Sequence, residues 1–173
     1  MRFLILTALL FLTSLGAKLY IEPILPGFLY FDPFLWWIAY WALFSQDKQS
    51  SLPAFGIGLL KDLLSTGAIG VYAILYVIVF RLIVQNKHKL FIENRYTQML
   101  VVFCGGFVVN SLYFVLMSLN SSNYDLISGI IRIFCIVVPT TLLTVPAFEF
   151  IEILSKLLRI EQNKRGQWLL PDY

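Results

Sequence analysis

The chain has 173 residues, of which 59% are hydrophobic and 13% are charged, and its mean hydropathy is +0.80. Soluble domains average about 45–50% apolar and about 25% charged residues, so this composition is typical of an integral membrane protein and leaves little chain for a water-soluble catalytic domain. The formal net charge is only +3 and the basic residues are scattered, which argues against nucleic acid as a partner.

Apolar runs in the sequence predict six membrane-spanning helices, at 3–17, 28–44, 52–64, 71–84, 96–119 and 126–154. The first run resembles a secretory signal peptide, because Arg2 precedes a short apolar core, but the charge pattern favours its retention as a span. We therefore expect one transmembrane domain over residues 1–160 and a short cytoplasmic tail over residues 161–173.

The distribution of Lys and Arg orients these spans. With the N-terminus inside, ten of the 13 basic residues fall in cytoplasmic segments, if Arg81 near the inner end of the run 71–84 is counted with them. Only Lys18 falls outside, while Lys61 and Arg132 lie within spans. Cytoplasmic loops of membrane proteins carry an excess of Lys and Arg. The sequence thus predicts an all-α, six-helix bundle with both termini in the cytoplasm.

Two of the predicted spans have unusual lengths. The third covers about 21 Å if it is helical over residues 52–65, against a hydrocarbon core of about 30 Å, so it must be extended, tilted in a thinned region or re-entrant. The last run is too long for one perpendicular crossing, and Pro139 and Pro146 predict a bend within it. Beyond that bend, Glu152 is spaced to pair with Lys156.

Asp62 is the most informative polar residue, because a carboxylate inside a membrane helix is costly and indicates a partner or a function. Lys61 points about 100° away around a helix, so a direct pair with it is awkward. Our preferred interpretation is an ion pair between Asp62 and Arg132, which should lie at similar depth. The alternative is that Arg132 reaches the outer headgroups while Asp62 caps or ends a short helix.

The second span begins with Asp32 and Pro33, which are typical of a helix start with Asp as N-cap and Pro at the first helical position. An aromatic cluster follows, either as a belt at the membrane interface or as packing within the protein. In the fifth span, Asn110 and Ser111 are expected to form hydrogen bonds across helices. The clustered aromatic residues are Trp36, Trp37, Tyr40 and Trp41.

No arrangement of residues predicts catalysis, a cofactor or a metal site. His88 is the single histidine and lies among basic residues, and Cys104 and Cys135 both fall inside apolar runs, where they are expected to act as small hydrophobic residues. The sequence also lacks the motifs of zinc proteases, serine hydrolases and nucleotide-binding loops. We therefore expect a protein that is not an enzyme.

The order of these features resembles the bacterial rod shape-determining protein MreD family over nearly the whole chain. The specific part runs from residue 33 to residue 84, where the segment 56–65 reads GIGLLKDLLS and is followed by a glycine at 70. Lys18 and Glu22 depart from the neutral polar residues that the family often has after the first span. The residues that match the family motif are Pro33, Gly56, Gly58, Asp62 and Gly70.

The resemblance implies a non-enzymatic, multi-pass protein of the bacterial inner membrane that belongs to the cell-elongation machinery. Such proteins bind MreC, a single-span protein with a periplasmic domain, and through it influence RodA, a class B penicillin-binding protein and the MreB filaments. They thereby help to control peptidoglycan synthesis and rod shape. The six-helix plan also resembles the substrate-binding subunits of energy-coupling-factor vitamin transporters.

Two mechanisms remain open from the sequence. In the first, a partner helix packs against the glycine-rich third span at Gly56 and Gly58, while Asp62 holds the local turn or pairs across helices. In the second, the protein is a solute-binding transport subunit whose cavity is lined by Asp62, Asn110, Arg132 and the tryptophans. A channel or proton-coupled carrier is disfavoured, because no helix has a polar stripe and no inverted repeat is visible.

Overall fold

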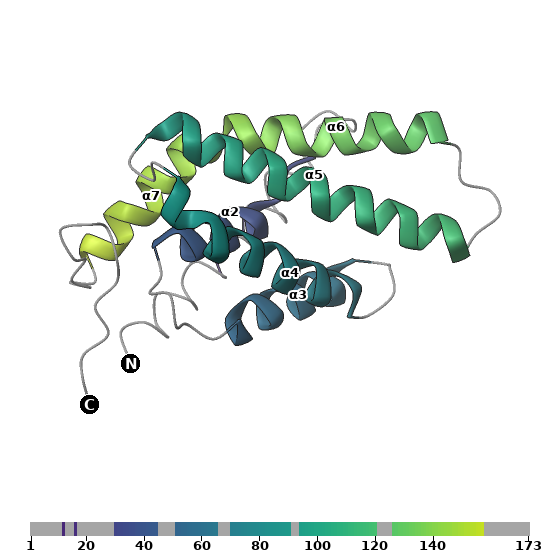
Figure 1. Ribbon diagram of the computed structural model, residues 1–173, viewed down its shortest axis with the longest axis horizontal. Helices are drawn as coiled ribbons and strands as arrows, with labels where there is room; N and C mark the ends of the chain where they lie inside the picture. Colours follow the sequence, from purple (N-terminus) through teal and green to yellow (C-terminus); the bar gives the residue numbers. More distant parts are fainter. Residues whose placement is uncertain are drawn as a thin grey trace.

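The computed structural model describes residues 30–44, 51–65, 70–90, 94–120 and 126–157, with the isolated positions 12 and 16. Within these ranges the chain is all helical, as predicted, and contains no strand (Figure 1). The first predicted span, apart from positions 12 and 16, and the tail 161–173 lie outside the described residues. The α-helices are α2 (Pro33–Phe44), α3 (Leu52–Leu64), α4 (Val71–Asn86), α5 (Arg95–Asn120), α6 (Leu126–Leu142) and α7 (Thr144–Leu157), with a 3-10 helix at Lys87–Lys89.

The helix boundaries agree closely with the apolar runs of the sequence. Helix α3 has the predicted bounds and carries a proline in its first turn, where a missing backbone N–H costs little. Helix α4 begins directly after Gly70, whose φ of 97° is a left-handed conformation that glycine adopts without strain. Helix α2 is shorter than the predicted second span, because it begins at Pro33 rather than at residue 28.

Helix α2 forms the centre of the bundle. Ten of its twelve residues are buried, and it contacts α3, α4, α5 and α7. Its aromatic side chains contact neighbouring helices: the rings of Tyr40 and Phe148 meet edge to face at 5.2 Å, and those of Trp41 and Phe80 at 6.5 Å. The aromatic cluster is therefore internal packing, and the alternative of an interfacial belt is wrong for these residues.

Helices α5 and α6 lie side by side and antiparallel along the longest axis of the molecule, while α3 and α4 form a second antiparallel pair (Figure 1). Among the described residues, α5 alone is long and apolar enough to cross a membrane as one straight helix. At 1.5 Å per residue its 26 residues cover about 39 Å. The shorter α2, α3 and α4 cover only about 18–24 Å each, which is less than the hydrocarbon core of a membrane. For these three segments the structure confirms the predicted apolar helices but not that each one is a full span.

The bend predicted in the last apolar run is present. Helices α6 and α7 meet at Leu143 at an angle of 48°, and together they have the length and apolar character of one broken span. The break lies between Pro139 and Pro146, and a proline ring clashes with the carbonyl four residues earlier, which for Pro146 belongs to Leu142. Helix α7 also contains the predicted ion pair between Glu152 and Lys156, at 2.9 Å.

Candidate functional site

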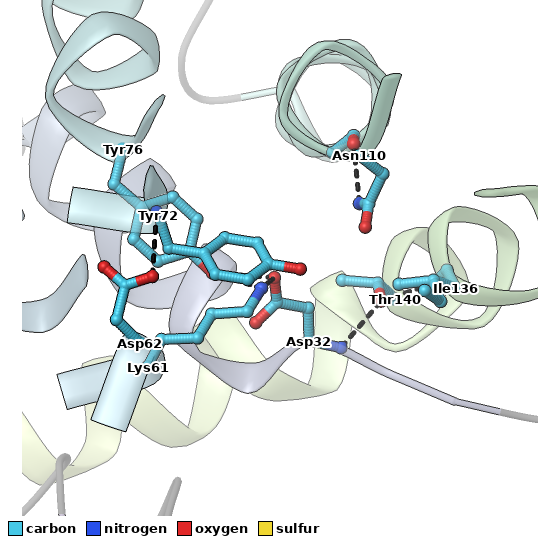
Figure 2. Close-up of polar contacts among 9 residues, drawn as sticks. Asp32, Lys61, Asp62, Tyr72, Tyr76, Asn110, Ile136 and Thr140 are labelled. Atoms are coloured by element: carbon cyan, nitrogen blue, oxygen red, sulfur yellow. Dashed lines mark hydrogen bonds and ion pairs between the residues drawn. The ribbon is translucent and has the colours of Figure 1, made fainter. Parts of the chain in front are cut away.

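A buried ion pair between Lys61 and Asp32 joins α3 to the start of α2. Tyr76 of α4 completes the cluster: Lys61 Nζ donates to the Tyr76 hydroxyl at 2.8 Å, and that hydroxyl donates to Asp32 Oδ2 at 2.7 Å (Figure 2). The side chains of Tyr76, Asp32 and Lys61 are almost completely buried. Opposite charges and a hydroxyl thus form a polar cluster without net charge in an apolar core, which lowers the cost of burying each charge.

The ring of Tyr72 covers the ammonium group of this cluster. Lys61 Nζ lies 4.0 Å from the centroid of the Tyr72 ring and 5.0 Å from that of Tyr76, within the range of cation–π attraction. Tyr72 also stacks on Tyr113 of α5, with ring centroids 4.5 Å apart. The aromatic rings of α4 and α5 therefore continue the packing from the ion pair toward α5.

Asp32 also connects α2 to the bent end of α6. Its backbone N–H donates to the hydroxyl of Thr140 at 2.9 Å, and the indole of Trp36 donates to the carbonyl of Thr140 at 2.8 Å. Thr140 is buried one turn before the break at Leu143. The prediction that the Asp32 side chain is an N-cap is wrong, since Oδ2 binds Lys61 and Tyr76, whereas Pro33 does occupy the first helical position.

Asp62 caps the N-terminus of α4 from the neighbouring helix. Its Oδ2 accepts the backbone N–H groups of Gly70 at 3.0 Å and Ala73 at 3.1 Å, and its Oδ1 accepts that of Tyr72 at 3.0 Å. The first N–H groups of a helix have no partner within it and carry partial positive charge, so a carboxylate placed there is stabilised. The alternative in which Asp62 caps a helix is closest to this arrangement, although the helix that it caps is the next one.

The ion pair that we predicted between Asp62 and Arg132 is not present in the described part of the chain. Both carboxylate oxygens of Asp62 are already bound by backbone N–H groups, and Arg132 lies on α6, which packs mainly on α5. The similar depth predicted for Asp62 and Arg132 in the membrane suggested this pair, but the sequence could not show that α4 begins directly beside Asp62. The expectation that Lys61 does not pair with Asp62 is confirmed, because adjacent residues of α3 face α2 and α4 respectively.

The two glycines of the third span have different surroundings. A Cβ atom at Gly58 would lie 2.3 Å from Ala73 Cα and 2.8 Å from the carbonyl oxygen of Tyr72, so α3 and α4 touch backbone to backbone there. The close approach expected at Gly58 is therefore real, but its neighbour belongs to the same chain. At Gly56 a Cβ atom would meet nothing within 4 Å.

A cavity of about 250 Å³ lies between α4, α5 and α6. Arg132 is the charged residue of its lining, and Asn110 and Ser128 add polar groups. The hydrogen bond predicted across helices for Asn110 is not observed, since its amide donates to Gly106 O of the same helix at 2.8 Å. The remaining lining residues are aromatic or apolar: Tyr72, Tyr113, Phe114, Met117, Gly129, Ile133 and Ile136.

Comparison with known proteins identifies the family. Residues 1–160 match the sequence model of the rod shape-determining protein MreD. The chain belongs to the MreD family. Comparisons with curated proteins and with solved structures gave no significant match.

Membership of the MreD family assigns this chain to rod shape determination, and that family is one of membrane proteins and is not a known enzyme family. The helical, apolar structure agrees with a membrane location. In the described residues no group of three His, Cys, Asp or Glu side chains could hold a metal ion. Of the family-motif residues, Pro33 begins α2, Gly58 and Asp62 join α3 to α4, Gly70 directly precedes α4, and Gly56 faces open space.

The buried polar cluster of this MreD-family chain was only partly predictable from its sequence. We predicted a role for Asp62 and placed Lys61 within a span, but we missed Asp32 as the partner of Lys61. The available signal was the charge balance of the apolar segments: Asp32 is an acidic residue at the edge of an apolar run, 29 residues before the lysine at position 61. Tyr76 has no comparable signal, because tyrosine is common in membrane helices.

Proposed function

We propose that this protein is a non-enzymatic scaffold of the cell-elongation complex in the bacterial inner membrane, where it binds an MreC-type single-span protein. The observation that carries the proposal is the match of residues 1–160 to the MreD family. Through MreC it would act on RodA, the class B penicillin-binding protein and MreB, and so on peptidoglycan synthesis and rod shape. We further propose that it crosses the membrane several times, with both termini in the cytoplasm, which the distribution of Lys and Arg supports.

The outward side of α3 is the surface that we propose for the MreC span. Leu52, Phe55 and Leu63 are exposed there, and Gly56 lies between them with open space above it. Helices in lipid associate through close backbone approach and van der Waals packing, because lipid tails are as apolar as the side chains. A glycine flanked by exposed large apolar residues fits this type of contact, whereas Gly58 is already covered by α4.

Affinity purification of the tagged protein from its native membranes, followed by mass spectrometry, tests the proposal. We expect MreC and peptidoglycan synthases to co-purify with the wild type, and we expect Gly56→Leu and Leu63→Ala to lower the recovery of MreC. Leu119→Ala, at an exposed position at the end of α5, is the matched control and should leave recovery unchanged. Equal recovery from all variants would exclude the α3 surface, and absence of MreC from the wild-type sample would contradict the scaffold function.

The cavity favours one other candidate, a substrate-binding subunit of an energy-coupling-factor type vitamin transporter. Its volume of about 250 Å³ and its mixture of aromatic walls with Asn110 and Arg132 would suit a small polar ligand. The same purification separates the two functions. Recovery of ATPase subunits in place of MreC would support transport.

A further inference from the structure

The cavity between α4, α5 and α6 has an unbalanced charge. Among the described residues, Arg132 is the one charged residue of its lining, and none of the ion pairs formed by these residues includes its guanidinium. Asp62, the acidic residue that we had expected opposite Arg132, is held by the N-terminus of α4. Arg132 is an exposed residue on the wall of this cavity, and a cation on an apolar helix attracts an anion, so the cavity has the electrostatic character of an anion site.

The groups around Arg132 suit the oxygen atoms of a phosphate group. A guanidinium offers a planar set of donors that binds phosphate oxygens in pairs. The amide of Asn110 has two N–H groups, one of which donates to Gly106 O, so the other can donate to a ligand. The hydroxyl-bearing residues Tyr72 and Ser128 line the same space.

The size and position of the cavity indicate the rest of the ligand. Its volume of about 250 Å³ is below the range of about 300–1,000 Å³ for sites that enclose drug-sized molecules, so it would accept a headgroup rather than a whole lipid. Met117, Ile133 and Ile136 give it an apolar wall. Arg132 lies six residues after the first residue of α6, about 9 Å along the helix, so the site is near one end of the α5–α6 pair.

We propose that this cavity binds the phosphate group of an anionic amphiphile, with Arg132 as the charged contact and Tyr72, Asn110 and Ser128 around the phosphate. Exposed apolar residues of α5 and α6 that adjoin lining residues in the sequence, such as Leu116 next to Met117 and Ile130 next to Gly129, would then accompany the acyl chains. This site is independent of the α3 surface that we assign to the MreC span. The test of this site can therefore fail while the proposed function is confirmed, and the reverse.

Native mass spectrometry of the full chain, purified in detergent and incubated with phosphatidylglycerol, tests the site. We expect the wild type to retain bound lipid, and Arg132→Gln to weaken retention at least about tenfold, since a hydrogen bond to a charged group is strong. Ser128→Leu leaves the charge in place but fills the cavity, and it should weaken retention as well. Arg81→Gln removes an exposed arginine of α4 outside the cavity lining and is the control with unchanged retention.

The source of the phosphate is resolved by a parallel measurement with inorganic phosphate. A rise in the thermal unfolding temperature with inorganic phosphate that Arg132→Gln abolishes would support the site and assign it to a soluble phosphate. Retention of phosphatidylglycerol without such a rise would support it and assign the phosphate to lipid. Equal retention by Arg132→Gln and Arg81→Gln, or normal retention by Ser128→Leu, would overturn the proposal, because Arg132 would then contact only bulk headgroups. Circular dichroism of each variant without ligand checks that it is folded.

Discussion

The contact between Gly58 and α4 allows a sharp test of the fold, because the same helix supplies its own control. In Gly58→Ala the new Cβ atom would lie 2.3 Å from Ala73 Cα and 2.7 Å from Ala73 N. Carbon atoms prefer separations of about 3.5–4.0 Å, so α3 and α4 must move apart by about 1.2 Å at this point. In Gly56→Ala the new Cβ atom meets nothing within 4 Å.

The magnitude follows from three contributions. Overpacking of a tight contact costs about 1–3 kcal/mol. Moving Ala73 away also breaks the 3.1 Å hydrogen bond from its N–H to Asp62, and a hydrogen bond to a charged group contributes about 1.5–3 kcal/mol. Replacing glycine by alanine in a helix returns about 1 kcal/mol. We expect Gly58→Ala to lower the free energy of unfolding by about 1.5–5 kcal/mol, and Gly56→Ala to raise it by up to about 1 kcal/mol.

The assay is unfolding of the purified variants in mixed detergent micelles, followed by circular dichroism at a helix-sensitive wavelength. The difference between the two variants is the decisive quantity, because both substitutions add the same methyl group to the same helix. If Gly58→Ala were as stable as Gly56→Ala, the backbone contact between α3 and α4 would be refuted. The hydrogen bonds from α4 to Asp62 would then also require a different arrangement.

The same unfolding assay tests the polar contacts. Asp32→Asn and Lys61→Met should each lower the free energy of unfolding by about 3–5 kcal/mol, because each leaves one buried charge without its partner. The double variant should lose less than the sum of the two single losses, and additive losses would contradict the ion pair. Asp62→Asn should cost about 2–4 kcal/mol, since an amide cannot accept all three backbone N–H groups at the start of α4, and a neutral result would show that the cap is unimportant. Arg95→Gln should change stability by less than about 1 kcal/mol, because Arg95 and Glu149 are both solvent-exposed, and a larger loss would indicate a buried role.

The sequence was sufficient to predict the helices but not their contacts. The bounds of α3 and the bend between α6 and α7 follow from local signals, namely apolar runs and prolines, and both are confirmed. Local signals also explain Pro33 at the start of α2. These features depend on residues close together in the chain, which is why a single sequence contains them.

The partners of Asp62 and Lys61 depend instead on how helices pack. Depth in the membrane placed Asp62 and Arg132 at one level, but depth does not specify which helices are neighbours. In the structure α3 packs on α4, so the backbone N–H groups of α4 reach Asp62 first. For the same reason the sequence predicted that Gly58 allows a close contact between backbones, but it could not predict which helix makes that contact.

The partners of the two charged residues of α3 bear on how the protein enters the membrane during synthesis. A lysine or an aspartate opposes insertion by about 2.5–3.5 kcal/mol each at the centre of an inserting helix and by less toward its end, so Lys61 and Asp62 in the last turn of α3 together oppose entry by up to about 5–7 kcal/mol. The partner of Lys61 is on α2, which is synthesised earlier, and the groups that neutralise Asp62 are at the start of α4, which is synthesised later. Helix α3 is therefore stable in lipid only between its two neighbours, and α2, α3 and α4 are expected to leave the translocon together rather than one helix at a time.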